Sequence, residues 1–356
     1  MAAAGHSEDT PDRAAEALGS AEFVRLVASA DGDALAAVGL LARGLDRAGT
    51  PYHASLSAVP EPVATDGCTV SIGHSAGDVT LDRRPVTAEA VSILETMAPD
   101  AIDPEIALAG AVSVGAEPPE GLFERTSLER HPGVAVPTDD RIEGLAASTL
   151  VHTEYSGDRE TVEAAVSGLD HPSGRDLASF LALSVVDDAP PRAAEAVERA
   201  LRPYATERFE TLGGFADVLD AVARTEPGTG LALALGNAVD EAAYDAWVAH
   251  GKRSHSALRT ADSGRYDGFY VVRIPDAAPA SLGTVARLAF WYRSPEPIAL
   301  AVTDDAAAAV TDGAVEPAFA ESAETLGGRA NVRNGAATAV FDGTADEFTA
   351  AFRRAV

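Results

Sequence analysis

Two aspartates that directly follow a hydrophobic stretch are the residues of this chain best placed to do chemistry. Asp31 and Asp33 come after the apolar segment 23–28, and a run of small apolar residues with helical character begins at Asp33. In an α/β sheet, ligands and metals bind at the carboxyl ends of the strands. Paired carboxylates suit hard divalent ions such as Mg²⁺ or Mn²⁺, whereas a single aspartate here would only cap the helix. We therefore expect both carboxylates to face one crevice.

A second motif with catalytic potential is Gly73-His74-Ser75-Ala76-Gly77, which matches the Gly-x-Ser-x-Gly pattern of α/β-hydrolases. That pattern places a serine nucleophile on a sharp turn between a strand and a helix. Residues 78–82 are rich in β-branched side chains and predict a strand in place of the helix. A serine esterase that uses Ser75 is therefore the alternative hypothesis.

The charge of the chain restricts its partners. Asp and Glu outnumber Lys and Arg by 55 to 27 among 356 residues, the formal net charge is −28, and Lys252 is the only lysine. This composition is typical of adaptation to molar salt, as in halophilic archaea. At about 1 M salt the screening length falls to about 3 Å, so the overall charge no longer excludes a nucleic-acid partner. Most of the affinity from counterion release is also lost, and a few local arginines would carry the contact.

The compartment follows from what the sequence lacks. The single cysteine, Cys68, forms neither an internal disulfide nor a cysteine-based zinc site. Residues 1–12 show no basic region followed by an apolar core, as a signal peptide would. The apolar runs are far shorter than the roughly 18 residues that cross a membrane. We expect a cytoplasmic protein without a membrane segment.

The order of apolar stretches predicts an α/β fold that begins with a mostly parallel sheet. Strands are expected over 23–28, 52–59 and 69–72, and the helices that cover them over 33–48, 87–97 and 104–114. A helical connecting region follows, and a smaller α/β unit ends the chain, with strands over 268–274, 297–302 and 336–341. The predicted organisation is an acidic tail (1–17), an α/β domain with a helical part (18–186), a linker (187–205) and a C-terminal domain (206–356).

Residues 31–37, with three weaker stretches further along the chain, resemble the DHH phosphoesterase superfamily, which includes the RecJ exonucleases. Residues 31–37, Asp-Gly-Asp-Ala-Leu-Ala-Ala, resemble its first motif, His-x-Asp-x-Asp-Gly, with Ser29 at the histidine position and Ala34 at the glycine position. The weaker stretches that resemble archaeal RecJ-type proteins are 148–158, 213–236 and 327–337. The resemblance implies a DHH-like domain, a helical connection and a C-terminal DHH-associated domain.

The resemblance also implies a site. Active members hold two Mn²⁺ ions, so Asp31 and Asp33 would be catalytic metal ligands, and His74 and Asp82 would be weaker candidate ligands. The Asp-His-His motif that names the superfamily is absent, and Asp82-Arg83-Arg84 lies in its region; arginine does not ligate a cation.

A phosphate-binding loop is the other part of the implied site. Gly327, Gly328, Arg329 and Arg333 resemble the glycine-rich substrate loop of the DHH-associated domain. By contrast, we expect Arg224 and Arg287 at the surface or at helix ends, and Trp247 and Trp291 in the core.

Two hypotheses follow from the resemblance. In one, the chain is a single-strand-specific exonuclease with a weakened Mn²⁺ or Mg²⁺ site, acting on single-stranded nucleic acid or a small phosphodiester. In the other, catalysis is lost and the chain is a nucleic-acid-binding or replisome scaffold, like the eukaryotic replicative-helicase component that is an inactive RecJ relative. The missing ligands favour the second, because two-metal hydrolysis needs both ions.

Overall fold

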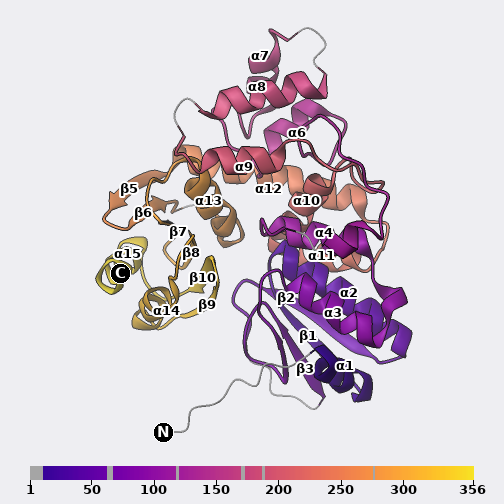
Figure 1. Ribbon diagram of the computed structural model, residues 1–356. Helices are drawn as coiled ribbons and strands as arrows, with labels where there is room; N and C mark the ends of the chain where they lie inside the picture. The colour runs from indigo at the N-terminus through magenta and orange to yellow at the C-terminus, as the bar shows by residue number, and fades with distance from the viewer. Residues whose placement is uncertain (1–10, 62–66, 118–119, 170–172, 187–188, 276) are drawn as a thin grey trace.

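The computed structural model describes residues 11–61, 67–117, 120–169, 173–186, 189–275 and 277–356 (Figure 1). The first sheet lies in the N-terminal part and is entirely parallel, in the order β2-β1-β3-β4. Its strands are β1 (Val24–Ser29), β2 (Tyr52–Ser57), β3 (Cys68–Ile72) and β4 (Val79–Leu81). The chain leaves β1 for β2 on one side and returns to β3 on the other, so a crevice opens at the carboxyl ends of these strands.

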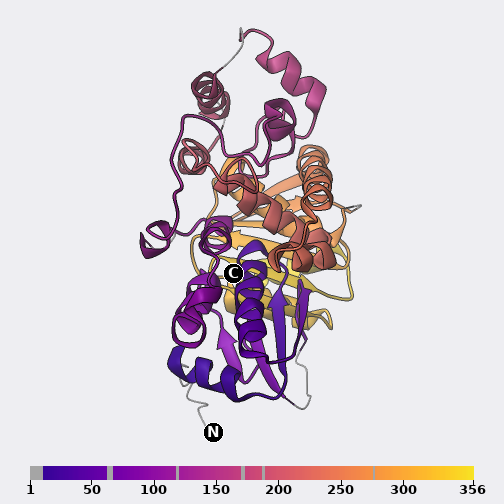
Figure 2. The ribbon, with the colours of Figure 1, turned by 90° about the vertical axis from the view of Figure 1, so that its right-hand side faces the viewer.

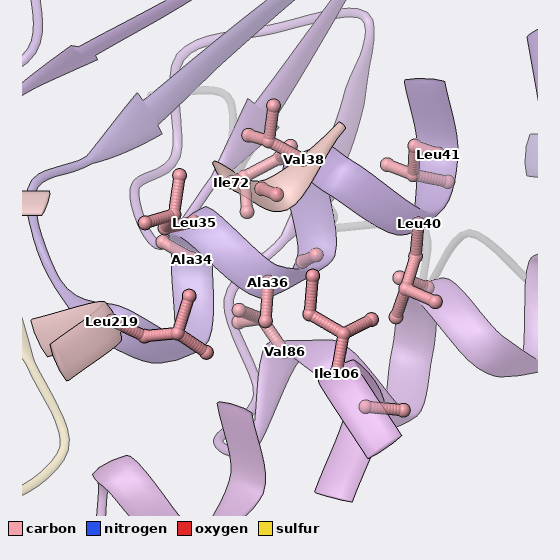
Figure 3. Close-up of a cluster of buried hydrophobic side chains, with 14 of the residues drawn as sticks. Ala34, Leu35, Ala36, Val38, Leu40, Leu41, Ile72, Val86, Ile106 and Leu219 are labelled. Carbon is pink, nitrogen blue, oxygen red and sulfur yellow. The ribbon is translucent and has the colours of Figure 1, made fainter. Parts of the chain in front are cut away.

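Small residues allow the helix after β1 to lie at the centre of the first core. Helix α2 (Gly32–Ala48) has 13 of its 17 residues buried and ends at Gly49, whose φ of 73° is left-handed. Figure 3 shows its apolar side chains packed against Ile72 of β3, Val86 and Ile106. The helices around it are α3 (Val86–Met97), η1 (Pro99–Ala101) and α4 (Pro104–Ser113).

Part of the predicted N-terminal tail is helical. Residues 11–17, which the composition assigned to the tail, belong to helix α1 (Pro11–Ser20), and Ala14, Ala15 and Leu18 are buried in the first core. The acidic residues of this segment lie beside an apolar face that packs on the core. Residues 1–10 of the predicted tail lie outside the described residues.

A helical region connects the two sheets, and Figures 1 and 2 show α6–α9 beyond them at one end of the molecule. Its helices are α5 (Glu120–Phe123), α6 (Arg141–Ala147), α7 (Arg159–Val166), α8 (Gly174–Val186), α9 (Ala193–Ala200), α10 (Leu212–Thr225), α11 (Pro227–Ala234) and α12 (Asp240–Thr260). Helices α10 and α11 pack on α2 in the first core, whereas α8 and α9 belong to a second core. The predicted linker 187–205 thus contains α9.

The C-terminal unit is built on a six-stranded, mostly antiparallel sheet in the order β5-β6-β7-β8-β10-β9. The strands are β5 (Asp262–Tyr266), β6 (Phe269–Arg273), β7 (Ile298–Val302), β8 (Ala306–Thr311), β9 (Arg329–Arg333) and β10 (Ala336–Val340). The helices are α13 (Pro279–Tyr292), α14 (Glu316–Thr325) and α15 (Ala345–Ala355). The predicted α/β fold, with a parallel sheet followed by helices and a smaller C-terminal α/β unit, is confirmed. No helix in the described ranges is long and apolar enough to span a bilayer.

Candidate functional site

Asp31 lies at the carboxyl end of β1, and its two carboxylate oxygens accept hydrogen bonds from different parts of the chain. Its Oδ1 accepts a hydrogen bond from the Ala34 backbone N–H at 2.9 Å, which caps α2. Its Oδ2 accepts a hydrogen bond from Arg333 Nη1. Burial alone would raise the pKa of this carboxyl, but the guanidiniums of Arg333, Arg84 and Arg224 outweigh burial and lower the pKa. Asp31 is therefore ionised and paired.

Asp33 is buried on the first turn of α2 and holds the start of α3. Its Oδ1 accepts from the Thr87 backbone N–H at 3.0 Å and from the Thr87 hydroxyl at 2.8 Å, and its Oδ2 accepts from the Val86 N–H at 2.8 Å. Burial and the charge of Asp31 raise the pKa of Asp33, against the opposing effect of Arg333. The sequence predicts that both carboxylates face one crevice, but Asp33 is fully buried and is turned toward α3. Each aspartate is already engaged in hydrogen bonds.

Arg333 comes from the end of β9, in the other domain, and is 6% exposed. Its Nη1 also donates to Ser29 Oγ at 3.2 Å, and its Nη2 lies 3.8 Å from Asp33 Oδ2. The sequence assigns Arg333 to a phosphate-binding loop, whereas the structure directs its guanidinium to the carboxylates. It therefore binds Asp31 directly and lies against Asp33.

The other predicted metal ligands do not complete a site. His74 Nε2 lies 2.9 Å from the Val27 backbone oxygen, to which it donates, and burial lowers the pKa of this imidazole. Asp82 is exposed in the loop after β4. Among the described residues, no group of three or more His, Cys, Asp or Glu side chains is arranged to hold a metal ion. The donor set of Asp31 and Asp33, with Arg333 against it, does not fit a divalent ion.

The remaining residues of the predicted phosphate loop lie away from Asp31 and Asp33. Gly327, Gly328 and Arg329 are at the opposite end of β9 from Arg333, and Arg329 forms an ion pair with Glu61 at 2.5 Å. None of the three lines the cleft described below.

An arginine–aspartate cluster that the sequence analysis did not single out lies beside Asp31. Asp220 on α10 accepts hydrogen bonds from Arg224 Nε at 3.0 Å and Nη2 at 2.9 Å, and its Oδ2 lies 3.4 Å from Arg287 Nη2 on α13. It also accepts from the Gly32 backbone N–H at 3.2 Å. Burial would raise the pKa of Asp220, but both arginines outweigh it and lower the pKa. The i, i+4 spacing of Asp220 and Arg224 is the signal that could have revealed this cluster.

A cleft of about 1280 Å³ joins these groups between the two domains. Its lining contains seven arginines and six carboxylates, although the whole chain carries a formal charge of −28. The arginines are Arg84, Arg130, Arg199, Arg202, Arg224, Arg287 and Arg333, and the acids are Asp31, Glu117, Glu195, Glu198, Asp220 and Asp312. The cleft therefore has one more arginine than carboxylates, in a protein whose overall charge is strongly negative.

Aromatic rings stand beside the exposed arginines of this cleft. The guanidinium carbon of Arg199 lies 4.3 Å from the centre of the Trp291 ring, and that of Arg130 lies 4.6 Å from the Tyr204 ring. Trp247 is buried as the sequence predicts, but Trp291 is only half-buried and lines the cleft. Arg224, in the last turn of α10 as predicted, and Arg287, which lies within α13 rather than at its end, also line it.

The serine esterase alternative lacks its structural context. Gly73–Gly77 form a turn after β3, and within residues 67–86, all described, the chain continues into β4 rather than into a helix. The elbow motif requires a strand–turn–helix unit. Ser75 is exposed on this turn, and its motif neighbour His74 is turned toward the Val27 carbonyl oxygen.

His250 makes the stability of this region sensitive to acid. It is buried on α12, with Thr284 Oγ1 2.8 Å from Nε2, and burial together with the charges of Arg224, Arg287 and Arg253 lowers its pKa to about 3 against the opposing effect of Asp220. Unfolded histidine titrates near 6.5. The contribution of His250 is therefore complete above pH 6.5 and is lost toward pH 3, by about 1.4 kcal/mol per pH unit within that window.

Between pH 6.5 and 4.5, unfolding of the wild type takes up about one proton at His250. We expect His250→Gln to remove this proton uptake and so to reduce the slope of the free energy of unfolding against pH by about 1.4 kcal/mol per pH unit. Urea denaturation at a series of pH values measures this slope. His53→Gln, at an exposed position on β2, is the control and should leave the slope unchanged. Equal slopes in the wild type and the His250 variant would show that this imidazole does not resist protonation.

Comparison with solved structures identifies the class of fold. RecJ from Thermus thermophilus in complex with Mg²⁺ superposes with a TM-score of 0.51 at 16% identity, covering 97% of this chain and 51% of that one. Exonuclease RecJ bound to manganese gives 0.51 at 16% identity, with 97% and 93% covered. CDC45 from Entamoeba histolytica gives 0.58 at 9% identity, with 94% and 95% covered. The chain thus has a RecJ-like fold of the DHH type, and it spans about half the length of the T. thermophilus protein.

Sequence comparison gives the family. Residues 261–354 match the family model described as "Uncharacterized protein rrnAC1427, C-terminal domain". The uncharacterized protein rrnAC1427 of Haloarcula marismortui is 48% identical over 369 residues, which cover 98% of this chain and 97% of that protein. The chain belongs to the rrnAC1427 family.

Proposed function

We propose that this protein binds single-stranded nucleic acid in the cleft between its two domains and acts as a binding or scaffold protein. The observation that carries the proposal is the gathering of seven arginines in the lining of one cleft of a chain with a formal charge of −28. Arginine donates to phosphate in a planar, bidentate geometry. The fold supports the proposal, since one similar solved structure is described as an exonuclease.

The stacked arginines favour single strands over duplex. Arg130, Arg199 and Arg202 are exposed, and no carboxylate of the described residues forms an ion pair with them. The rings of Trp291 and Tyr204 lie against the guanidiniums of Arg199 and Arg130, and an exposed guanidinium can also stack on an unpaired base. Arginine and aromatic side chains together are the usual means of binding unpaired bases.

The arrangement of the two aspartates favours binding over hydrolysis. The oxygens of Asp31 and Asp33 accept five protein hydrogen bonds between them. Two-metal hydrolysis needs ligands that place two cations against the scissile phosphate. Any replisome partner, the further expectation from the family resemblance, stays a prediction.

The test is the affinity for labelled single-stranded DNA and RNA, measured by fluorescence anisotropy at about 0.5 and 3 M KCl because the composition indicates adaptation to high salt. We expect Arg199→Ala to weaken binding about fivefold, corresponding to about 1 kcal/mol for a stacked cation. Arg125→Ala is the matched control, since it removes the same charge from an exposed arginine that pairs with Glu95 outside the cleft. Equal losses in the two variants, or no binding by the wild type, would contradict the proposal.

The competing function is a Mn²⁺-dependent exonuclease that rests on Asp31 and Asp33. Incubation of end-labelled strands with the wild type and with an Asp31→Ala/Asp33→Ala variant distinguishes the two. Mn²⁺-dependent cleavage that the double variant loses would establish the nuclease. Binding without cleavage is the result that we expect.

A further inference from the structure

The β9–β10 hairpin (329–340) of the C-terminal domain lies against the carboxyl edge of the N-terminal sheet (Figure 1). The hairpin makes hydrogen bonds at several points besides Arg333. These are Asn331 Nδ2 to the Gly73 oxygen at 3.3 Å, Arg84 Nη1 to the Asn334 oxygen at 3.2 Å and Thr338 Oγ1 to the Ala58 oxygen at 2.8 Å. The guanidinium of Arg333 is therefore held in place by the docking of the hairpin.

This guanidinium is the positive charge that the structure places against the aspartate pair. It contacts Asp31 Oδ2 and Ser29 Oγ through Nη1, and its Nη2 lies 3.8 Å from Asp33 Oδ2. Its Nε and Nη2 have no hydrogen-bond partner in the described part of the chain, although the residue is only 6% exposed. Such a buried, incompletely hydrogen-bonded cation is costly unless it neutralises charge.

Neighbouring residues leave room for the arginine. A Cβ on Gly73, whose φ is 77°, would lie 2.8 Å from Arg333 Nη1 and 2.0 Å from Ser29 Oγ. The small side chain of Ser29 and the absence of one at Gly73 therefore make the approach of the guanidinium possible. The space beside the carboxylates is shaped for an arginine.

We infer that Arg333 is an internal replacement for a divalent cation. Its positive charge neutralises the pair of Asp31 and Asp33, and the pair binds Mn²⁺ once a neutral residue replaces the arginine. Two carboxylate oxygens with retained water molecules are an ordinary donor set for such a cation. This inference does not depend on what the cleft binds.

Mn²⁺ binding to the full-length protein tests the inference, with the free ion measured by electron paramagnetic resonance. We expect Arg333→Ala to bind one Mn²⁺ at least about tenfold more tightly than the wild type, a gain that would appear as a Tm shift on adding Mn²⁺. Arg329→Ala is the matched control, because it gives the same net charge from the same strand and should respond to Mn²⁺ as the wild type does. Adding Asp31→Asn to the Arg333 variant should abolish the gain.

Arg333→Gln provides a second neutral variant whose amide can still donate to Asp31. If neither neutral variant folds without added ions, the titration is performed during refolding, where Mn²⁺-dependent recovery supports the inference. Equal Mn²⁺ binding by the Arg333 and Arg329 variants would overturn the inference. In the refolding experiment, it would also be overturned if the neutral variants recovered their fold without Mn²⁺ or did not recover it at all. If the wild type did not bind single-stranded nucleic acid, only the proposed function would be refuted.

Discussion

Replacing Asp220 by alanine is expected to lower the free energy of unfolding by about 3–5 kcal/mol, the usual cost of breaking a buried ion pair. Asp220 is 4% exposed and is paired with both Arg224 and Arg287. Its removal leaves two guanidiniums next to each other in a desolvated region. It also removes the acceptor of the Gly32 N–H at the start of α2. Chemical denaturation in concentrated KCl, followed by circular dichroism, measures the loss.

Two further variants isolate the cause. Asp220→Asn keeps an acceptor for the Gly32 N–H but removes the charge, so it should retain most of the loss. Glu95→Ala breaks the exposed pair with Arg125 and should cost less than about 1 kcal/mol. If Asp220→Ala destabilised the protein no more than Glu95→Ala does, the stability of the protein would not depend on the charge of Asp220 beside Arg224 and Arg287.

The second large effect concerns Trp247, which is fully buried on α12. Trp247→Ala is expected to cost about 3–5 kcal/mol, because a large cavity opens between α12 and α10. The indole N–H also donates to Asp217 Oδ2 at 2.8 Å, and Asp217 in turn accepts hydrogen bonds from the backbone and hydroxyl of Thr149. The Thr149 hydroxyl accepts from Arg287 Nη2 at 2.9 Å, so the tryptophan helps to position an arginine of the cleft.

The same denaturation experiment distinguishes packing from hydrogen bonding. Trp247→Phe fills most of the space but loses the donor to Asp217, for which we expect a cost of about 1–3 kcal/mol. Trp291→Ala, at the half-buried tryptophan of the cleft, should destabilise less than Trp247→Ala. A reversal of that order would mean that the first core does not depend on Trp247.

Local patterns were sufficient to predict much of the fold. Strands β1 and β3 are largely apolar or β-branched, and β2 alternates apolar with polar residues; all three were predicted close to their observed positions. In the C-terminal sheet, the predictions identified β6, β7 and β10 but missed β5, β8 and β9. Strand β8 (Ala306–Thr311) is dominated by alanine, which has a low strand propensity. It forms a strand because its neighbours β7 and β10 complete its hydrogen bonds.

The site was less predictable than the fold. The position of Asp31 at the edge of the sheet was predicted correctly, because that inference uses only neighbouring residues, whereas Asp33 is buried against α3 and does not face the crevice. The partner of Asp31 could not be found in this way, since no periodicity connects β1 with the end of β9. The orientation of Arg333 depends on how the two domains dock, and the glycines near it suggested a phosphate loop instead.

The ion pair of Asp31 and Arg333 also bears on the order in which the protein folds. The two residues are 302 positions apart in the sequence, and during synthesis the N-terminal domain emerges and folds first. The parallel sheet must therefore form while its aspartates are still uncompensated, and the pair closes only when the last hairpin docks. If the pair is absent from the folding transition state, it acts on the rate of unfolding rather than on the rate of folding. Arg333 would thus set how long the native state persists once it is reached.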